Sequence, residues 1–193
     1  METEVIFQSI LGVLVGVGLS SAVGLRIFAP FFVMSIAAAG GILPLAEGFE
    51  WIATTPALIA FGIAMLLEVG GYWIPWVDNA LDALTAPVTM IAGVIATASV
   101  VTDLPPILQW TVAIIAGGGA ASLLHGGTAV LRAGSTATTA GLANPLIATV
   151  ELVASVVGSL LAIAVPVLAL ALFVFLVWWV RRKFRRRAEV IEV

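Results

Sequence analysis

The sequence predicts an all-α membrane protein that crosses the bilayer several times, and its composition and its pattern of apolar runs both support this. Of its 193 residues, 62% are hydrophobic and only 10% are charged, and the mean hydropathy is +1.20. Soluble domains carry about 25% charged residues. The apolar residues gather in about six long runs, which prolines, glycines and charges separate. Because lipid offers no partners to backbone polar groups, such runs form helices.

The first two runs differ in how easily they can cross a bilayer. Val5 to Val23 is long enough, and its small residues at Gly12, Gly16 and Gly18 predict a face on which another helix packs closely. Ile27 to Leu43 has 17 residues, which is the short limit for a hydrocarbon core of ~30 Å. This second run therefore either crosses the membrane or forms a re-entrant hairpin.

The later runs follow a loop over residues 44–56. We expect them to form four further spans, over Ala57 to Trp73, Ala86 to Val101, Ile107 to Leu124 and Leu152 to Val180. Val77 to Leu84, between the first and second of these runs, predict a short helix that places Asp78 and Asp82 on one face. The six tryptophans fall near the predicted ends of runs, as interfacial aromatic residues do.

The chain is predicted to be one membrane domain, residues 1–180, followed by a basic tail, residues 181–193. Six of its eight Lys and Arg residues lie in this tail, which predicts a cytoplasmic C-terminus that contacts anionic lipid headgroups rather than nucleic acid. The acidic N-terminus lacks the positive charge of a cleavable signal, so we expect the first run to be retained. These features predict a multi-pass membrane protein whose C-terminus faces the cytoplasm.

A weak internal repeat relates residues of about 1–76 to residues of about 107–180. Shifting the chain by 106 residues aligns Gly12 with Gly118 and Arg26 with Arg132. Four apolar runs separate the two arginines. If all four cross, both arginines lie on the outer side and the repeats are parallel; if one is re-entrant, the arginines lie on opposite sides and the repeats are inverted.

Residues 125–151 are the most polar internal stretch, and we interpret them as the functional segment. They are rich in glycine and hydroxyl residues and contain an Asn-Pro pair. We expect this stretch to be a broken, non-helical segment, which survives at membrane depth only when protein buries it or when it lines a watery cavity. The candidate lining residues of a solute path here are His125, Arg132, Ser135, Thr136, Thr138, Thr139 and Asn144.

Arg26 and Arg132 are the only Lys or Arg residues outside the tail. An arginine in hydrocarbon costs at least ~2.5 kcal/mol, so each must face protein or water and have a partner. The candidate partners are Glu68, Asp78, Asp82 and Glu151. These groups either form buried ion pairs that fix the helix register or line a polar path.

The predicted helix starts near the arginines favour an anionic solute. Helices that begin after Pro30 and at Pro145 would point backbone N–H groups toward the arginines, and helix N-termini attract anions. His125 either relays protons with Glu68 or Glu151 or only bonds backbone groups. The hydroxyl run, taken alone, equally fits helix packing.

Several functional classes find no support in the sequence. Cysteine is absent and histidine occurs once, so we expect no metal site and no thiol chemistry. No nucleophile elbow, phosphate-binding loop or zinc-protease pattern occurs, and we therefore expect neither an enzyme nor a cofactor.

The stretch HGGTAVLRAGSTATTAGLANPLIATVEL, which begins at His125, resembles the prokaryotic membrane family called domain of unknown function 4126. Residues 24–30, Gly-Leu-Arg-Ile-Phe-Ala-Pro, and residues 74–82 are similar to its early and middle motifs. Thr128 stands where the resemblance implies Lys in many members, and Leu152 stands where it implies Asp. The resemblance implies a membrane protein and no particular activity.

Three functions are consistent with these features. The first is a small inner-membrane transporter or channel, in which a homo-oligomer embedded in membrane lipids moves a small anionic solute past the arginines. The second is a lipid-handling protein, such as a scramblase or lipid carrier, that binds headgroups in the polar segment. The third is a structural or assembly subunit that binds another membrane protein through its glycine faces.

Overall fold

The computed structural model describes residues 2–72 and 74–191, and all regular structure in this part of the chain is helical. The side chains of residues 2–3, 72, 75–84, 180–181 and 183–191 lie outside the description. The helices are α1 (Glu2–Val23), α2 (Phe28–Ala39), α3 (Thr55–Tyr72), α4 (Pro75–Ala98), α5 (Pro106–Val112), α6 (Gly119–Thr139), α7 (Asn144–Ala164) and α8 (Pro166–Ile191). A 3₁₀ turn, η1 (Glu50–Ala53), precedes α3, and a π-helical segment, η2 (Ala113–Gly118), joins α5 to α6.

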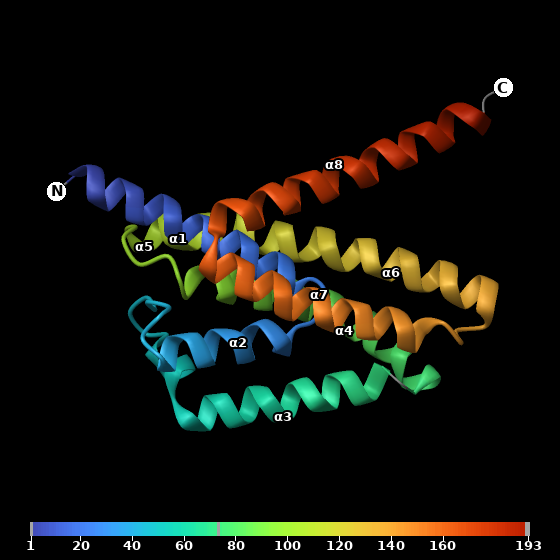
Figure 1. Ribbon diagram of the computed structural model, residues 1–193, viewed down its shortest axis with the longest axis horizontal. Helices are drawn as coiled ribbons and strands as arrows, with labels where there is room; N and C mark the ends of the chain where they lie inside the picture. Colours follow the sequence, from blue (N-terminus) through green and yellow to red (C-terminus); the bar gives the residue numbers. More distant parts are fainter. Residues whose placement is uncertain (1, 73, 192–193) are drawn as a thin grey trace.

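The helices form an elongated bundle with α1, α4, α6 and α7 at its centre (Figure 1). The hairpin of α2 and α3 covers one side, and α3 forms the outer edge there. On the opposite side α8 diverges from the bundle, and its C-terminal end lies far from the N-terminus of α1. The charged and polar side chains discussed below lie where α1, α2, α6 and α7 meet.

Three helical stretches are long and apolar enough to cross a membrane: Glu4–Val23, Pro106–Thr139 and Asn144–Ala164. Four shorter apolar helices accompany them in the described chain. This confirms an all-α protein with membrane-protein character. Helix α2 has 12 residues, and at 1.5 Å per residue its length of ~18 Å is shorter than a hydrocarbon core of ~30 Å.

Small residues let α1 pack against two neighbours at once. A Cβ atom added at Gly16 would lie 2.8 Å from the side chain of Thr97 on α4, and one at Gly18 would lie 2.7 Å from Cβ of Ala162 on α7. The hydroxyl of Ser20 donates to the carbonyl of Gly93, 2.6 Å away. The expected packing role of the α1 glycines is therefore correct, and α1 is held between α4 and α7.

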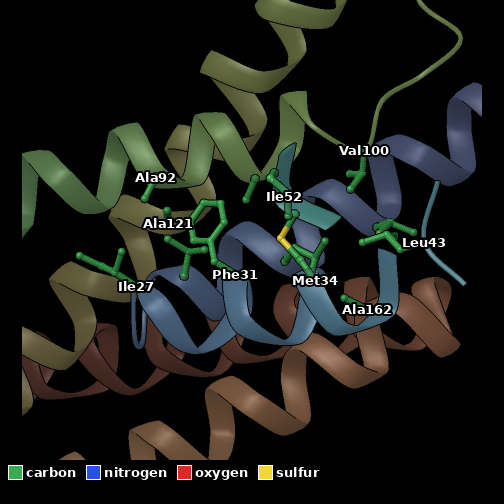
Figure 2. Packing of buried hydrophobic residues seen from close by; sticks show 14 of the residues in the cluster. Ile27, Phe31, Met34, Leu43, Ile52, Ala92, Val100, Ala121 and Ala162 are labelled. Atoms are coloured by element: carbon green, nitrogen blue, oxygen red, sulfur yellow. The ribbon is translucent and has the colours of Figure 1, made fainter. Parts of the chain in front are cut away.

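Larger side chains fill the region between α1, α2 and the residues 40–54 connection. Figure 2 shows Met34 of α2 directed toward Ile52, with Phe31 and Ile27 nearer the α1–α2 turn. Met34 and Ile52 are fully buried. The hydroxyl of Ser35 donates to the carbonyl of Ile52 at 2.6 Å, so this connection is fixed to α2 by both apolar and polar contacts.

The last apolar run does not form the single helix predicted over Leu152 to Val180. Helix α7 ends at Ala164, Val165 leaves the helical region with φ −142° and ψ 72°, and α8 begins at Pro166. Proline cannot donate the backbone hydrogen bond that would continue α7, and it disfavours helical backbone at the residue before it.

The predicted helix start at Ala86 is also wrong, because α4 begins at Pro75 and continues through Pro87 to Ala98. A proline inside a helix removes one backbone hydrogen bond, and a membrane helix tolerates this where its surroundings satisfy the freed group. Pro87 and Pro166 thus have opposite effects on the chain.

Most of the segment predicted to be broken is helical. Helix α6 continues through His125 to Thr139, and only residues 140–143 form a turn. Ala140 and Gly141 have positive φ angles of 52° and 84°, which reverse the chain into α7. In an apolar environment, the backbone hydrogen bonds of a helix outweigh the weak helix propensity of glycine and threonine.

Candidate functional site

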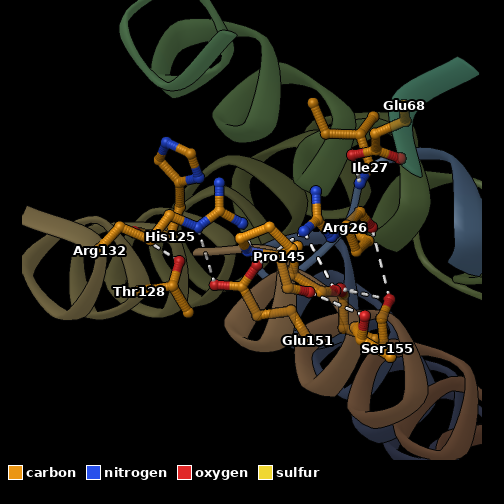
Figure 3. Close-up of polar contacts among 12 residues, drawn as sticks. Arg26, Ile27, Glu68, His125, Thr128, Arg132, Pro145, Glu151 and Ser155 are labelled. Atoms are coloured by element: carbon orange, nitrogen blue, oxygen red, sulfur yellow. Dashed lines mark hydrogen bonds and ion pairs between the residues drawn. The ribbon is translucent and has the colours of Figure 1, made fainter. Parts of the chain in front are cut away.

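Three buried charged side chains form the centre of the site, and we call Arg26, Arg132 and Glu151 the charged cluster. Nη2 of Arg26 donates to Oε2 of Glu151 at 3.0 Å. Arg132 donates through Nε to Oε1 of Glu151 at 3.3 Å and through Nη2 to Oε2. Figure 3 shows both guanidinium groups converging on this one carboxylate. The two arginines therefore share Glu151 as an ion-pair partner.

The turn between α6 and α7 explains why Arg132 meets Glu151. Arg132 lies seven residues before the end of α6 at Thr139, and Glu151 lies seven residues after the start of α7 at Asn144. Seven residues are about two helical turns. Because residues 140–143 reverse the chain, the two side chains come to the same level of the α6–α7 hairpin.

Arg26 reaches the same carboxylate from the turn between α1 and α2. Its Nη2 also donates to the carbonyl of Ala148 on α7 at 3.2 Å. Ser155, one turn beyond Glu151, donates its hydroxyl to the carbonyl of Ala22 at 2.9 Å. These bonds fasten the α1–α2 turn to α7 and hold Arg26 at Glu151.

Both arginines therefore meet at one position in the bundle, because they contact one carboxylate. Whether the repeats are parallel or inverted stays open. The internal duplication itself stays a prediction.

The charged cluster is buried. The exposed fractions are 1% for Arg26, 4% for Arg132 and 4% for Glu151. Burying a charge is costly unless other charges or hydrogen bonds compensate it.

Glu68 bonds the backbone of the α1–α2 turn. Its Oε1 accepts from the N–H of Ile27 at 2.9 Å and its Oε2 accepts from the N–H of Phe28 at 3.0 Å. The N-terminal backbone groups of α2, which the sequence suggested would face an anionic solute, thus bind the carboxylate of Glu68. Helix α3 is thereby attached to the residues that directly follow Arg26.

Replacing Glu68 with alanine is expected to lower the free energy of unfolding by about 1–2 kcal/mol, because two helix N-terminal N–H groups lose their acceptor. Thermal unfolding of the purified protein in detergent measures this loss. Glu50→Ala is the matched control, since Glu50 is exposed in η1. Equal unfolding temperatures for the Glu68 variant and the native protein would contradict the capping role.

The predicted hydroxyl residues bond mainly within their own hairpin. Thr138 donates to the carbonyl of Gly134 at 2.9 Å, and Thr139 donates to the carbonyl of Ser135 at 2.7 Å. Ser135 Oγ lies 3.4 Å from the hydroxyl of Thr139. Thr138 and Thr139 are exposed on α6, so they lie outside the buried charged cluster.

Two other predicted residues lie nearer the α6–α7 hairpin interior. Asn144 is buried and its side-chain amide donates to the hydroxyl of Thr136 at 3.2 Å. His125 is half-buried, and its carbonyl accepts from the hydroxyl of Thr128 at 3.0 Å. In Figure 3 the His125 ring lies on the side of the Arg132 guanidinium away from Glu151.

Asp78 and Asp82 are also predicted site residues. Their side chains lie outside the described residues. Among the side chains that are described, no group of three or more His, Cys, Asp or Glu residues could hold a metal ion.

Sequence analysis missed a row of buried hydroxyls on α4 and α1. Thr97 and Ser20 are fully buried and lie 2.7 Å apart through their hydroxyls, and Thr89 is 1% exposed. A signal was present, because Thr85, Thr89, Gly93 and Thr97 recur every four residues and so share one face of α4.

Comparison with known proteins identifies a family and no activity. A family model described as "Domain of unknown function (DUF4126)" matches residues 13–186. No curated protein matches the chain. No solved structure matches it either.

Proposed function

The chain belongs to the family described as "Domain of unknown function (DUF4126)", and from its charged cluster we propose that it is a membrane transporter or channel for a small anion. The observation that carries this proposal is that two buried arginines share Glu151. Ionisable groups inside membrane bundles are costly and commonly mark solute or ion pathways. Two guanidinium groups that meet at one position favour an anion over a cation or a neutral solute.

An anion can enter this arrangement by exchange. Glu151 holds both guanidinium groups, so an anion that approaches one of them competes with a carboxylate rather than filling an empty site. After the exchange, the other arginine still neutralises Glu151. Guanidinium groups bind carboxylates and phosphates through paired hydrogen bonds, so small oxyanions are the preferred solute class.

The basic tail indicates how the protein is oriented in its membrane. We place the protein in a prokaryotic cytoplasmic membrane with the C-terminus inside, because a basic segment follows the last apolar helix. We also propose a homo-oligomer, since a chain of 193 residues is small for a single bundle that encloses a solute path by itself.

The test is flux of a panel of small anions, including nitrate, formate, acetate and phosphate, into proteoliposomes. Arg132→Gln is expected to reduce flux about tenfold, which corresponds to ~1.4 kcal/mol of lost interaction. This variant leaves Arg26 as an ion-pair partner of Glu151, so the buried carboxylate stays compensated. A monodisperse elution profile checks that it is folded.

Arg182→Gln is the matched control. Arg182 is exposed and its guanidinium lies 5.1 Å from the ring centre of Trp178, away from the charged cluster. Its flux should equal that of the native protein. Equal flux in the Arg132 variant, or no flux of any tested anion in the native protein, would reject the proposal.

One observation favours lipid handling as a second candidate. Thr138 and Thr139 place hydroxyls on the exposed surface of α6, where they can meet lipid headgroups. Scrambling of a fluorescent headgroup lipid is measured on the same vesicles. Scrambling without anion flux, and its loss in the double variant Thr138→Val and Thr139→Val, would support this candidate. Absence of both activities would favour the structural or assembly subunit.

A further inference from the structure

Thr89 differs from the other buried hydroxyl residues of the described helices, because each of those has a hydrogen-bond partner. Hydroxyls in membrane helices commonly donate to the carbonyl four residues earlier, as Thr111, Thr138, Thr139 and Thr149 do here. Thr89 makes no such bond. The residue is 1% exposed, and its hydroxyl has no hydrogen-bond partner among the described side chains and backbone.

A buried hydroxyl that lacks a partner needs an explanation, because buried polar groups in native proteins are nearly always hydrogen-bonded. A threonine at this position of α4 could bond its own helix, yet the Thr89 hydroxyl does not do so. Such a group is available to a ligand or to a water molecule that accompanies it.

The packing of α4 against η2 and α6 indicates the level at which Thr89 faces α6. Thr97 contacts Gly117, and a Cβ atom added at Gly93 would lie 2.5 Å from Cβ of Ala121. The two chain segments run in opposite directions in Figure 1. One further turn along each helix therefore brings Thr89 to the level of His125.

His125 in turn connects this position to the charged cluster. It precedes Arg132 by seven residues, about two turns, so both side chains share one face of α6. Figure 3 shows the His125 ring on the side of Arg132 away from Glu151. In the same view Arg26 at the α1–α2 turn lies between Arg132 and Glu68 of α3.

We propose that Thr89 of α4 and His125 of α6 form the side of the anion site where these two helices meet, in which the Thr89 hydroxyl donates a hydrogen bond to a small oxyanion attracted by Arg132 and Arg26. This inference rests on the proposed function and extends it to a residue on another helix. It assigns Thr89 as an anion-binding residue, whereas the hydroxyls of α6 that bond their own helix stay outside the site.

Nitrate is the probe for the test. Thr89→Val has nearly the shape of threonine without the hydroxyl, and Thr89→Ser keeps a hydroxyl. We expect Thr89→Val to raise the half-saturating nitrate concentration for flux about tenfold, and Thr89→Ser to stay within about twofold of the native value, since a tenfold change corresponds to one good hydrogen bond. Thr149→Val, on the exposed face of α7, should leave flux unchanged.

Unfolding temperature in detergent, measured with and without nitrate, gives a second readout that does not need transport. The native protein should melt at a higher temperature in nitrate, and Thr89→Val should lose this shift while melting no lower than the native protein without nitrate. A Thr89→Val protein that melts well below the native protein, or that keeps the full nitrate effect in both assays, would overturn the inference.

The two proposals fail in different ways. If the native protein shows nitrate flux that depends on Arg132 but not on Thr89, only the Thr89 inference is wrong. If the native protein shows no flux yet has a nitrate-dependent melting shift that Thr89→Val abolishes, the binding site stands and transport is rejected. Neither flux nor a melting shift in nitrate rejects both.

Discussion

Replacing Glu151 with alanine is expected to lower the free energy of unfolding by about 3–5 kcal/mol, because breaking a buried ion pair leaves uncompensated charge in the interior. The effect is large here since one carboxylate serves two arginines, each no more than 4% exposed. The six tryptophans provide the fluorescence signal for unfolding in detergent. A strong drop in the yield of folded protein would be the corresponding result in cells.

Two variants separate charge from packing in this experiment. Glu151→Gln keeps the size of the side chain and removes its charge, so it should lose most of the same stability. Glu47→Ala removes a carboxylate from the exposed 40–54 connection and should unfold like the native protein. If Glu151→Gln unfolds at the native temperature, the charged cluster does not stabilise the bundle as the contacts imply.

The members of the charged cluster could be predicted because the sequence offers few charges away from its tail. Arg26 and Arg132 each needed a carboxylate as partner, and Glu151 was one of four candidates. The sequence did not predict that both arginines would pair with the same carboxylate. The choice depends on the turn at residues 140–143 and on the bond from Ser155 to the α1 carbonyl of Ala22, which are features of packing.

Proline and polar residues gave weaker predictions, because their effect depends on what surrounds them. Pro87 lies inside α4, whereas Pro166 separates α7 from α8. Similarly, the polar and glycine-rich stretch after His125 suggested broken backbone, yet α6 stays helical until Thr139. Composition indicates where a helix is costly, while the neighbouring helices decide whether it continues.

Glycines illustrate the same limit, since the sequence does not say which of them carry contacts. Gly93 lies where α4 meets Ala121 and Gly117, so added atoms would meet backbone there. Gly126 lies in a helix as well, but a Cβ atom added to it would have no neighbour within 4 Å. The two positions therefore predict opposite responses to the same substitution.

Gly93→Ala is expected to destabilise the protein by about 1–3 kcal/mol, because the new methyl group would lie 2.5 Å from Cβ of Ala121 and 2.9 Å from the carbonyl oxygen of Gly117. Neither neighbour is a flexible side chain, so α4 must move away from α6. Gly126→Ala, by contrast, should stabilise α6 by up to ~1 kcal/mol, since alanine favours helix over glycine. Unfolding temperatures that shift in opposite directions would support this packing. A neutral or stabilising Gly93→Ala would mean that α4 and α6 lie farther apart than described. It would also contradict a position of Thr89 at the level of His125.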